Sequence, residues 1–128
     1  MIFGIGTDIV SVARIEKMLE EHGIRTAEKL LAESELADYH ATTQPAAFLA
    51  KRFAAKEALG KALGLGLRAP ATLHNIAIAH GELGRPLFKF AQPLTQFFEQ
   101  RGLQAHLSIS DESGMATAFV VVEYSEKL

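Results

Sequence analysis

The spacing of hydrophobic and polar residues predicts a strand, a turn and a helix at the start of this 128-residue chain. Residues 2–6 form a short apolar run, which is typical of a strand. Asp8 is expected just beyond that strand, in a turn that lets its carboxylate point outward. Ser11 is the expected N-cap of a helix that ends near Gly23, because apolar residues recur behind it at helical spacing.

Helical spacing continues through the first half of the chain. A second helix is expected from about Thr26, and another begins at Ser34 and Glu35. The longest helix begins near Pro45, because a proline in the first turn has no N–H to leave unsatisfied. It is expected to stop at Gly64.

The second half of the chain changes to the two-residue period of strands. One hairpin is expected from residues 75–79 and 87–90, and another from residues 105–110 and 115–124. A short helix at residues 93–100 separates them. Helices early and paired strands late predict an α+β fold with an antiparallel sheet rather than a regular alternation of strand and helix.

Length and composition narrow the class of protein. A chain of this length suits one domain covering residues 1–128. Thirteen Lys and Arg against fifteen Asp and Glu argue against a dedicated nucleic-acid binder. The absence of cysteine excludes thiol catalysis, disulfides and thiolate metal sites. No secretory leader or long apolar segment is recognisable, so we expect a cytoplasmic protein with no membrane partner.

Charged residues interrupt the apolar side of the longest predicted helix. At 3.6 residues per turn, Arg52 and Lys56 project from within its apolar arc. Glu57 and Lys61, four residues apart, lie together at the margin of the arc. The arc consists of Phe48, Leu49, Phe53, Leu59 and Leu63. Two interpretations stand: cationic stems that lie along apolar surface with their heads in water, or a pocket for an anion and a metal.

Asp8 and Glu57 would give a metal ion two carboxylate ligands. Mg²⁺ commonly takes one or two carboxylates and completes its shell with phosphate oxygens and water. Zinc and calcium are disfavoured, because the chain has no compact His/Cys set and no loop rich in oxygen ligands. Arg52, Lys56 and Lys61 would then clamp phosphate oxygens around the ion. An Asp in a turn more often bonds its own backbone, so the metal site depends on Glu57 as its partner.

A polar face is expected on the strand at residues 105–110. Alternation places His106, Ser108 and Ser110 on one face and apolar residues on the other. This face could line a site in which His106 contacts a phosphate, although a sheet with one solvated side is the commoner arrangement. The chain contains no complete dinucleotide fingerprint, Walker loop, zinc signature or nucleophile elbow.

Three blocks of sequence carry a family resemblance. They are residues 6–10 leading to Arg14 and Ile15, residues 53–58 with Lys61 and Gly64, and residues 106–110. Asn75 and the turn at residues 83–86 fit the same pattern, so the match covers nearly the full length. On these blocks the chain closely resembles the holo-acyl-carrier-protein synthases, the small bacterial members of the 4′-phosphopantetheinyl transferase family.

The resemblance implies a reaction and its catalytic residues. The reaction is the Mg²⁺-dependent transfer of 4′-phosphopantetheine from coenzyme A to a serine of apo acyl carrier protein, in support of fatty acid biosynthesis. Asp8 and Glu57 would bind Mg²⁺, and Lys61 would hold the reacting phosphate. Glu57 would also draw the serine proton, directly or through a water.

The resemblance also implies how coenzyme A is held. Arg52, Lys56 and His106 would contact its phosphates. The loop that contains Gly64 and Gly66 would lie near the nucleotide.

A homotrimer with active sites at subunit interfaces is implied as well, with a basic region around Arg14 that receives an acidic helix of the carrier protein.

One position departs from the family pattern, since Asp111 stands where many relatives have a second histidine. A carboxylate there would repel phosphate unless it pairs with a cation or contacts the metal through water. Asp111 and the modest charge of the partner helix keep a non-catalytic trimeric binding module as an alternative. A general phosphate-ester hydrolase is a third possibility.

Overall fold

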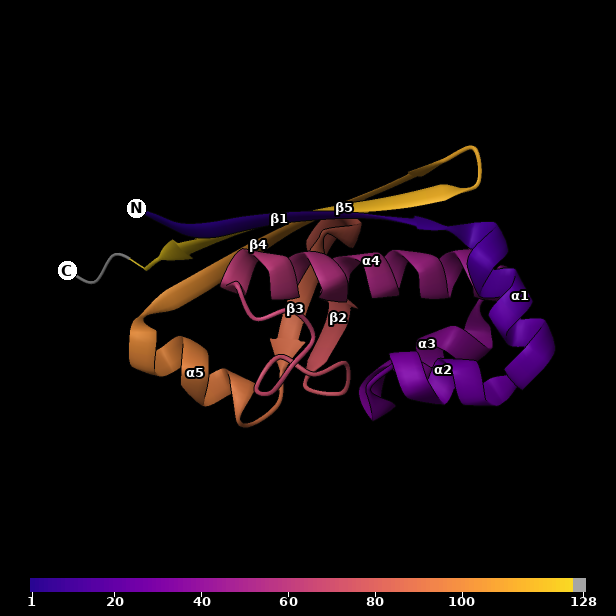
Figure 1. Ribbon diagram of the computed structural model, residues 1–128, viewed down its shortest axis with the longest axis horizontal. Helices are drawn as coiled ribbons and strands as arrows, with labels where there is room; N and C mark the ends of the chain where they lie inside the picture. Colours follow the sequence, from indigo (N-terminus) through magenta and orange to yellow (C-terminus); the bar gives the residue numbers. More distant parts are fainter. Residues whose placement is uncertain (126–128) are drawn as a thin grey trace.

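A three-stranded antiparallel sheet and one long helix form the frame of the fold (Figure 1). The computed structural model describes residues 1–125. In spatial order the strands of the sheet are β1 (Ile2–Ser11), β5 (Met115–Tyr124) and β4 (Leu103–Glu112). The long helix, α4 (Pro45–Leu63), lies along one face of this sheet.

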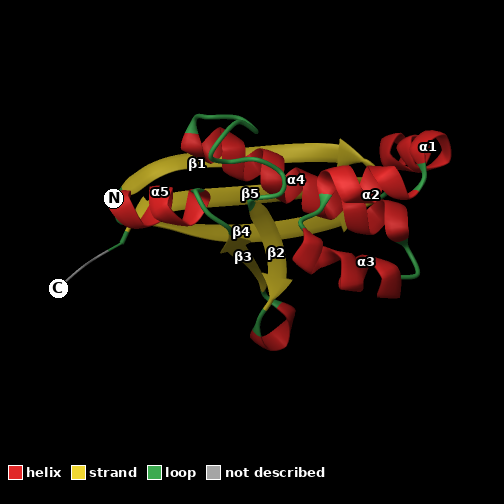
Figure 2. Cartoon of the chain, turned by 90° about the horizontal axis from the view of Figure 1, so that it is seen from below, coloured by secondary structure: helices red, strands yellow, loops and turns green. Residues whose placement is uncertain are grey.

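The other elements lie on the side of α4 that faces away from the sheet. A second hairpin runs crosswise to the three long strands (Figure 2) and consists of β2 (Ile76–His80) and β3 (Pro86–Phe90). The remaining helices are α1 (Val12–His22), α2 (Ile24–Leu30), α3 (Leu36–Ala41) and α5 (Leu94–Arg101), with 3-10 turns η1 (Glu33–Glu35) and η2 (Glu82–Gly84). The α+β fold with antiparallel sheets predicted from the sequence is confirmed.

The predicted helix ends are confirmed where capping residues mark them. The Ser11 side chain accepts a hydrogen bond from the backbone N–H of Arg14 at 3.3 Å, which caps α1. Pro45 is the first residue of α4. Gly64 ends this helix with φ of 76°, a left-handed conformation that glycine adopts without the steric cost paid by other residues. None of the helices among residues 1–125 is long and apolar enough to cross a membrane.

The predicted turn at Asp8 is wrong. β1 continues to Ser11, and Asp8 lies inside it opposite Ala118 of β5. The strand is longer than its apolar run because antiparallel pairing with β5 supplies backbone hydrogen bonds regardless of side-chain polarity. Asp8 therefore projects from a paired strand, which fixes its direction more firmly than a turn would.

Two glycines let β1 lie unusually close to α4. A Cβ atom on Gly6 would be 2.0 Å from the carbonyl oxygen of Ala58, and one on Gly4 would be 2.0 Å from that of Ala62. Alanines on the facing side of the helix permit the same approach. Side chains alternate between the two faces of a strand, so Asp8 projects from the same face as Gly4 and Gly6, toward α4. The strand thus delivers a carboxylate directly to the helix.

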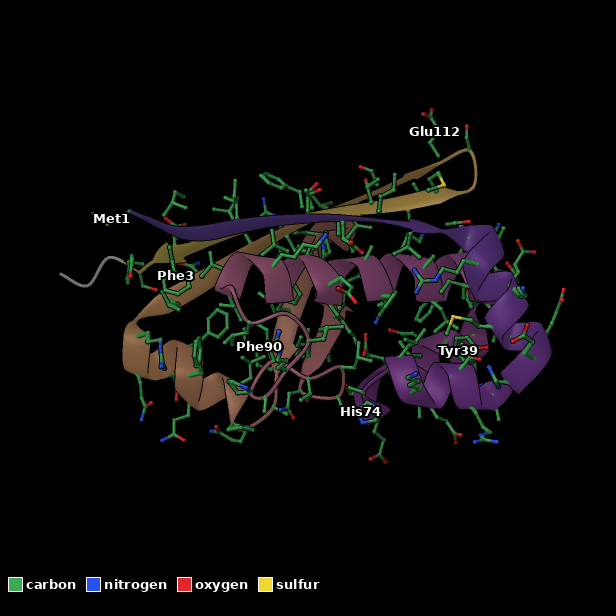
Figure 3. All side chains as sticks on the ribbon, viewed as in Figure 1. Met1, Phe3, Tyr39, His74, Phe90 and Glu112 are labelled. Carbon is green, nitrogen blue, oxygen red and sulfur yellow. The ribbon has the colours of Figure 1, made fainter. Side chains whose placement is uncertain are left out.

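The α4 helix is buried around most of its circumference, more widely than the predicted apolar arc. Alanines extend the arc, and Ala54, Ala55 and Ala58 are fully buried. Aromatic side chains fill the space on the side away from the sheet, where Figure 3 shows Phe90 and Tyr39. The helix is therefore the central element of the core, with contacts to both layers.

The opposite face of the three-stranded sheet carries exposed apolar side chains. Ile5, Ile9 and Phe119 are 62%, 60% and 47% exposed. Within residues 1–125, no helix or strand covers this face (Figure 1). We call it the outer sheet face. The predicted alternation of β4 is confirmed, because His106, Ser108 and Ser110 are exposed while the intervening residues pack toward the core.

Candidate active site

An aspartate, a glutamate and a lysine come together where β1 crosses α4. The Lys61 ammonium donates hydrogen bonds to the Asp8 carboxylate and to the backbone carbonyl of Thr7, both at 3.0 Å. The Asp8 side chain is 17% exposed and that of Lys61 is 51% exposed. The site is therefore at the protein surface, with its acid partly sheltered.

Glu57 lies close enough to Asp8 for their charges to interact. Burial, followed by the negative charge of Asp8, raises the pKa of Glu57 above its ordinary value of 4.5. Lys61 and Arg14 oppose this rise without cancelling it. The predicted neighbours Glu57 and Lys61 thus share one site, but Lys61 forms its ion pair with Asp8.

The same site includes Arg14 at the start of α1. Its guanidinium lies 5.9 Å from the centre of the Phe53 ring, and its charge acts on Glu57. The family resemblance implies for Arg14 only a place in a surface for a partner protein. The fold brings this arginine beside the carboxylates because α1 follows β1 after a single capping residue.

The donor set can hold a hard divalent cation. Asp8 and Glu57 offer carboxylate oxygens, the ligand type that Mg²⁺ prefers. Among residues 1–125, no cluster of three or more His, Cys, Asp or Glu suited to a metal is found. Two protein carboxylates with the other positions left to substrate and water agree with the way Mg²⁺ binds in phosphate-handling sites.

Lys56 is placed where no phosphate can reach it. Its side chain is 0% exposed, and its ammonium donates to Glu35 at 2.6 Å, to the Leu30 carbonyl at 2.8 Å and to the Leu73 carbonyl at 3.0 Å. An ammonium has three protons, and all three are used inside the protein. This arrangement does not favour the predicted role of Lys56 as a phosphate clamp.

Arg52 is buried as well, but it forms part of two cavity walls. Its side chain is 5% exposed, and its Nη1 donates to Glu35 at 3.0 Å and to the Ile78 carbonyl at 2.7 Å. A cavity of about 630 Å³ lies beside it, between α3, α4 and the β2–β3 hairpin. A smaller cavity of about 220 Å³ is lined by Arg52, Lys51, His80 and Asp111. Arg52 can therefore meet a ligand that enters either cavity.

The buried acid that holds these two cations was not predicted from the sequence. Glu35 is 1% exposed and was read only as the start of a helix. The signal was present, because Arg52 and Lys56 within an apolar arc require a buried counter-charge. Which acid supplies it depends on how α3 packs against α4, and the sequence pattern does not give that packing.

His106 lies apart from the carboxylate site within one chain. It is hydrogen bonded to Glu123 on the outer sheet face, whereas Asp8 projects from the face covered by α4. In register, Asp8 is opposite Ala118, and Ala118 is opposite Ile109. His106 is thus two strands across and three residues along, about 14 Å away in the plane of the sheet. The fold does not bring the two residues to one site.

The predicted glycine loop folds back over the end of α4, next to Lys61. The backbone N–H of Gly66 donates to the Gly60 carbonyl at 3.0 Å, and that of Gly64 donates to the Lys61 carbonyl at 3.0 Å. Both loop glycines have positive φ, 76° and 69°. The loop therefore packs on Gly60 at the end of α4, and β1 lies against the other side of the helix at Ala58 and Ala62.

A carboxylate pair with a lysine, at the crossing of a strand and a helix, is the kind of site that handles phosphate groups with a divalent cation. Comparison with known proteins gives the family. The family model described as the 4′-phosphopantetheinyl transferase superfamily matches residues 4–120. The chain belongs to this superfamily, and the resemblance read from its three sequence blocks is confirmed.

Individual relatives agree over nearly the whole length. The holo-[acyl-carrier-protein] synthase of Azoarcus sp. (strain BH72) is 55% identical over 123 residues, which cover 96% of this chain and 98% of that protein. The crystal structure of the synthase from Neisseria meningitidis superposes with a TM-score of 0.92 at 44% identity, covering 96% of this chain and 99% of that one. The Helicobacter pylori synthase in complex with coenzyme A gives a TM-score of 0.80 at 33% identity, covering 93% and 99%.

Proposed function

We propose that this protein transfers the 4′-phosphopantetheine arm of coenzyme A to a serine of apo acyl carrier protein, with adenosine 3′,5′-bisphosphate as the second product. One observation carries the proposal: Asp8, Glu57 and Lys61 form a single site in a chain of this superfamily. The name of the Azoarcus relative and the coenzyme A complex of the Helicobacter pylori relative support the same reaction. Fatty acid biosynthesis in the cytoplasm is its proposed setting.

Asp8 and Glu57 are the residues that would hold Mg²⁺. Burial and then the negative charge of Asp8 raise the pKa of Glu57, and a cation between the two carboxylates would relieve their repulsion. When bound, Mg²⁺ would supply stabilisation for the charge that develops on the phosphate oxygens.

Lys61 holds the reacting phosphate in this proposal. Two of its three N–H groups are fixed by Asp8 and Thr7, and the third is left for a phosphate oxygen. Because β1 and α4 set its orientation before substrate arrives, its charge needs little reorganisation during the reaction.

Glu57 takes the proton of the attacking serine. Its raised pKa brings it closer to the operating pH, which favours a general base. The serine oxygen forms a bond to the phosphorus of the 4′-phosphopantetheine group. The bond to the bridging pyrophosphate oxygen breaks, and its electron pair leaves with adenosine 3′,5′-bisphosphate.

Arg52 and His106 are the proposed phosphate contacts outside this centre, and the loop at Gly64 and Gly66 is the proposed neighbour of the nucleotide. The cavities beside Arg52 support its role. Lys56 is left out, because its three N–H groups are used internally.

A homotrimer with interfacial active sites is proposed for the assembly. Two features support it: the exposed apolar side chains of the outer sheet face, and the separation of His106 from Asp8 on opposite faces of one sheet. A coenzyme A molecule that meets both residues then needs two copies of the chain.

Subunit mixing tests this arrangement. Asp8→Ala and His106→Ala proteins, each weakly active alone, are unfolded together, refolded together and assayed. Interfacial sites predict partial recovery of activity, because some sites combine an intact Asp8 with an intact His106. Absence of recovery in a mixed assembly would contradict the interfacial site.

Arg14 is the proposed contact for an acidic helix of the carrier protein. It lies beside Glu57, so a carrier held there places its serine near the base. The exposed side of α1 also carries Glu16, Glu20 and Glu21. Electrostatic attraction of the carrier is therefore expected to be local to Arg14 rather than spread along the helix.

A transfer assay separates the proposed function from its alternatives. The protein is incubated with coenzyme A, Mg²⁺ and an apo carrier protein, and the carrier is weighed by mass spectrometry. Modification of the carrier supports the transferase. Binding of coenzyme A without modification would favour a binding module, and coenzyme A breakdown without any carrier would favour a hydrolase.

A further inference from the structure

The buried carboxylate of Glu35 joins three elements of the fold. Its Oε1 accepts hydrogen bonds from the backbone N–H of Ala32 at 2.9 Å and from Lys56 at 2.6 Å. Its Oε2 accepts from Arg52 at 3.0 Å and from the backbone N–H of Ile78 at 3.2 Å. Four bonds to one carboxylate connect η1, α4 and β2 at a single point.

These contacts fix one side of the Arg52 guanidinium and leave the other toward a cavity. Both protons of Nη1 are used, on Glu35 and on the Ile78 carbonyl. The plane of the group lies against the Phe48 ring, 4.4 Å from its centre. Nη2 lies 3.7 Å from the exposed carboxylate of Asp38, which lines the cavity of about 630 Å³. The Nη2 edge of Arg52 therefore points toward that cavity and toward the Asp38 carboxylate at its wall.

We propose that Glu35 is a positioning residue for substrate: it orients Arg52 so that the Nη2 edge meets a phosphate of coenzyme A. The inference rests on the proposed function, because that function supplies the phosphate. A guanidinium left without Glu35 would lose the bond that fixes its plane and direction. Glu35 itself is too deeply buried to touch the ligand.

The charges around Glu35 allow a charge-matched variant. With Asp38 included the cluster is neutral, and without Lys56 it would carry a net charge of −1. Glu35, Arg52 and Lys56 together carry a net charge of +1. Glu35→Gln alone raises that buried charge, and the protein could fail to fold. The double variant Glu35→Gln/Lys56→Met keeps it at +1 and leaves Arg52 without its fixed partner.

Binding of coenzyme A to the full-length protein tests the proposal by calorimetry. The double variant is expected to bind about tenfold more weakly, as is Arg52→Ala. Combining all three substitutions should weaken binding no further than Arg52→Ala, because Glu35 acts through Arg52. Glu33→Gln, an exposed acid on the same turn, is the matched control and should bind as the wild type does.

Wild-type affinity for coenzyme A in the folded double variant would overturn the positioning role. So would a further loss of affinity, equal to that of the double variant, when its two substitutions are added to Arg52→Ala. A wild-type protein that binds no coenzyme A would instead refute the proposed function, and the positioning role with it. ¹⁵N NMR of the Arg52 side chain gives a readout without any variant at Glu35. Slow guanidinium rotation and a shift on addition of coenzyme A support the proposal, and free rotation would contradict it.

Discussion

Gly6→Ala should separate β1 from α4 and displace Asp8 from Lys61. The new Cβ would lie 2.0 Å from the carbonyl oxygen of Ala58, although ordinary contacts begin near 3.4 Å. Strand and helix must therefore move apart by about 1 to 1.4 Å. Both clashing partners are backbone or next to it, so no side chain can rotate away.

The size of the effect follows from that shift. Overpacking of this kind costs about 3 kcal/mol at its upper range. For a chain of this length, we expect Tm to fall by roughly 10 °C. A displacement of about 1 Å at a catalytic group costs about a hundredfold in rate. Gly6→Ala should therefore lose stability and nearly all transfer activity.

Two further variants distinguish displacement of Asp8 from general destabilisation. Gly4→Ala would place a Cβ at the same 2.0 Å distance, from the Ala62 carbonyl oxygen, but at twice the sequence distance from Asp8. It should lose similar stability and less activity. Gly114→Ala occupies open space at φ of 77° and should cost only about 1 kcal/mol, with activity retained. Melting temperature and carrier modification are measured for all of them, and a Gly6→Ala protein with wild-type values in both assays would refute the close-approach argument.

Three other changes have defined outcomes. Because the pKa of Glu57 is raised, its ionisation lowers folded-state stability as pH rises above 4.5, and Glu57→Gln should raise Tm by an amount that grows with pH. Activity should fall at least about a hundredfold, and Mg²⁺ should no longer stabilise the variant. A Tm difference that does not change with pH would contradict this. Lys56→Met should lower the free energy of unfolding, measured by denaturant titration, by about 3 kcal/mol and should change coenzyme A affinity by less than about twofold. A large loss of affinity would instead show that Lys56 contacts a phosphate. Asp111→Asn should strengthen coenzyme A binding about two- to fivefold in calorimetry, because it removes a negative charge from the cavity that Arg52 lines. Weaker binding would indicate that Asp111 pairs with a cation there.

Local signals predicted most of the fold. Ser11, Pro45 and Gly64 mark helix ends through their own backbone chemistry, so their positions could be read without knowledge of the tertiary structure. The extent of β1 could not, because its pairing with β5 joins opposite ends of the chain. That long-range pairing moved Asp8 from a predicted turn into a strand.

The candidate site was predicted only where its residues are neighbours along one helix. Glu57 and Lys61 are four residues apart on one helix, so their proximity follows from helical geometry. The roles of Arg52 and Lys56 depend on Glu35, which reaches them only after α3 folds against α4. Helical periodicity shows that these cations enter the core, but it does not show whether a buried acid or a ligand receives them.

In the proposed function, Asp8 and Glu57 form a metal-dependent centre for phosphopantetheine transfer. Mass spectrometry of one apo carrier protein tests it most directly, after incubation with coenzyme A and either wild-type or Glu57→Gln protein, with Mg²⁺ or with a chelator. We expect the carrier to gain one 4′-phosphopantetheine group only with the wild-type protein and Mg²⁺. An unmodified carrier in that reaction, or equal modification by Glu57→Gln, would contradict the account.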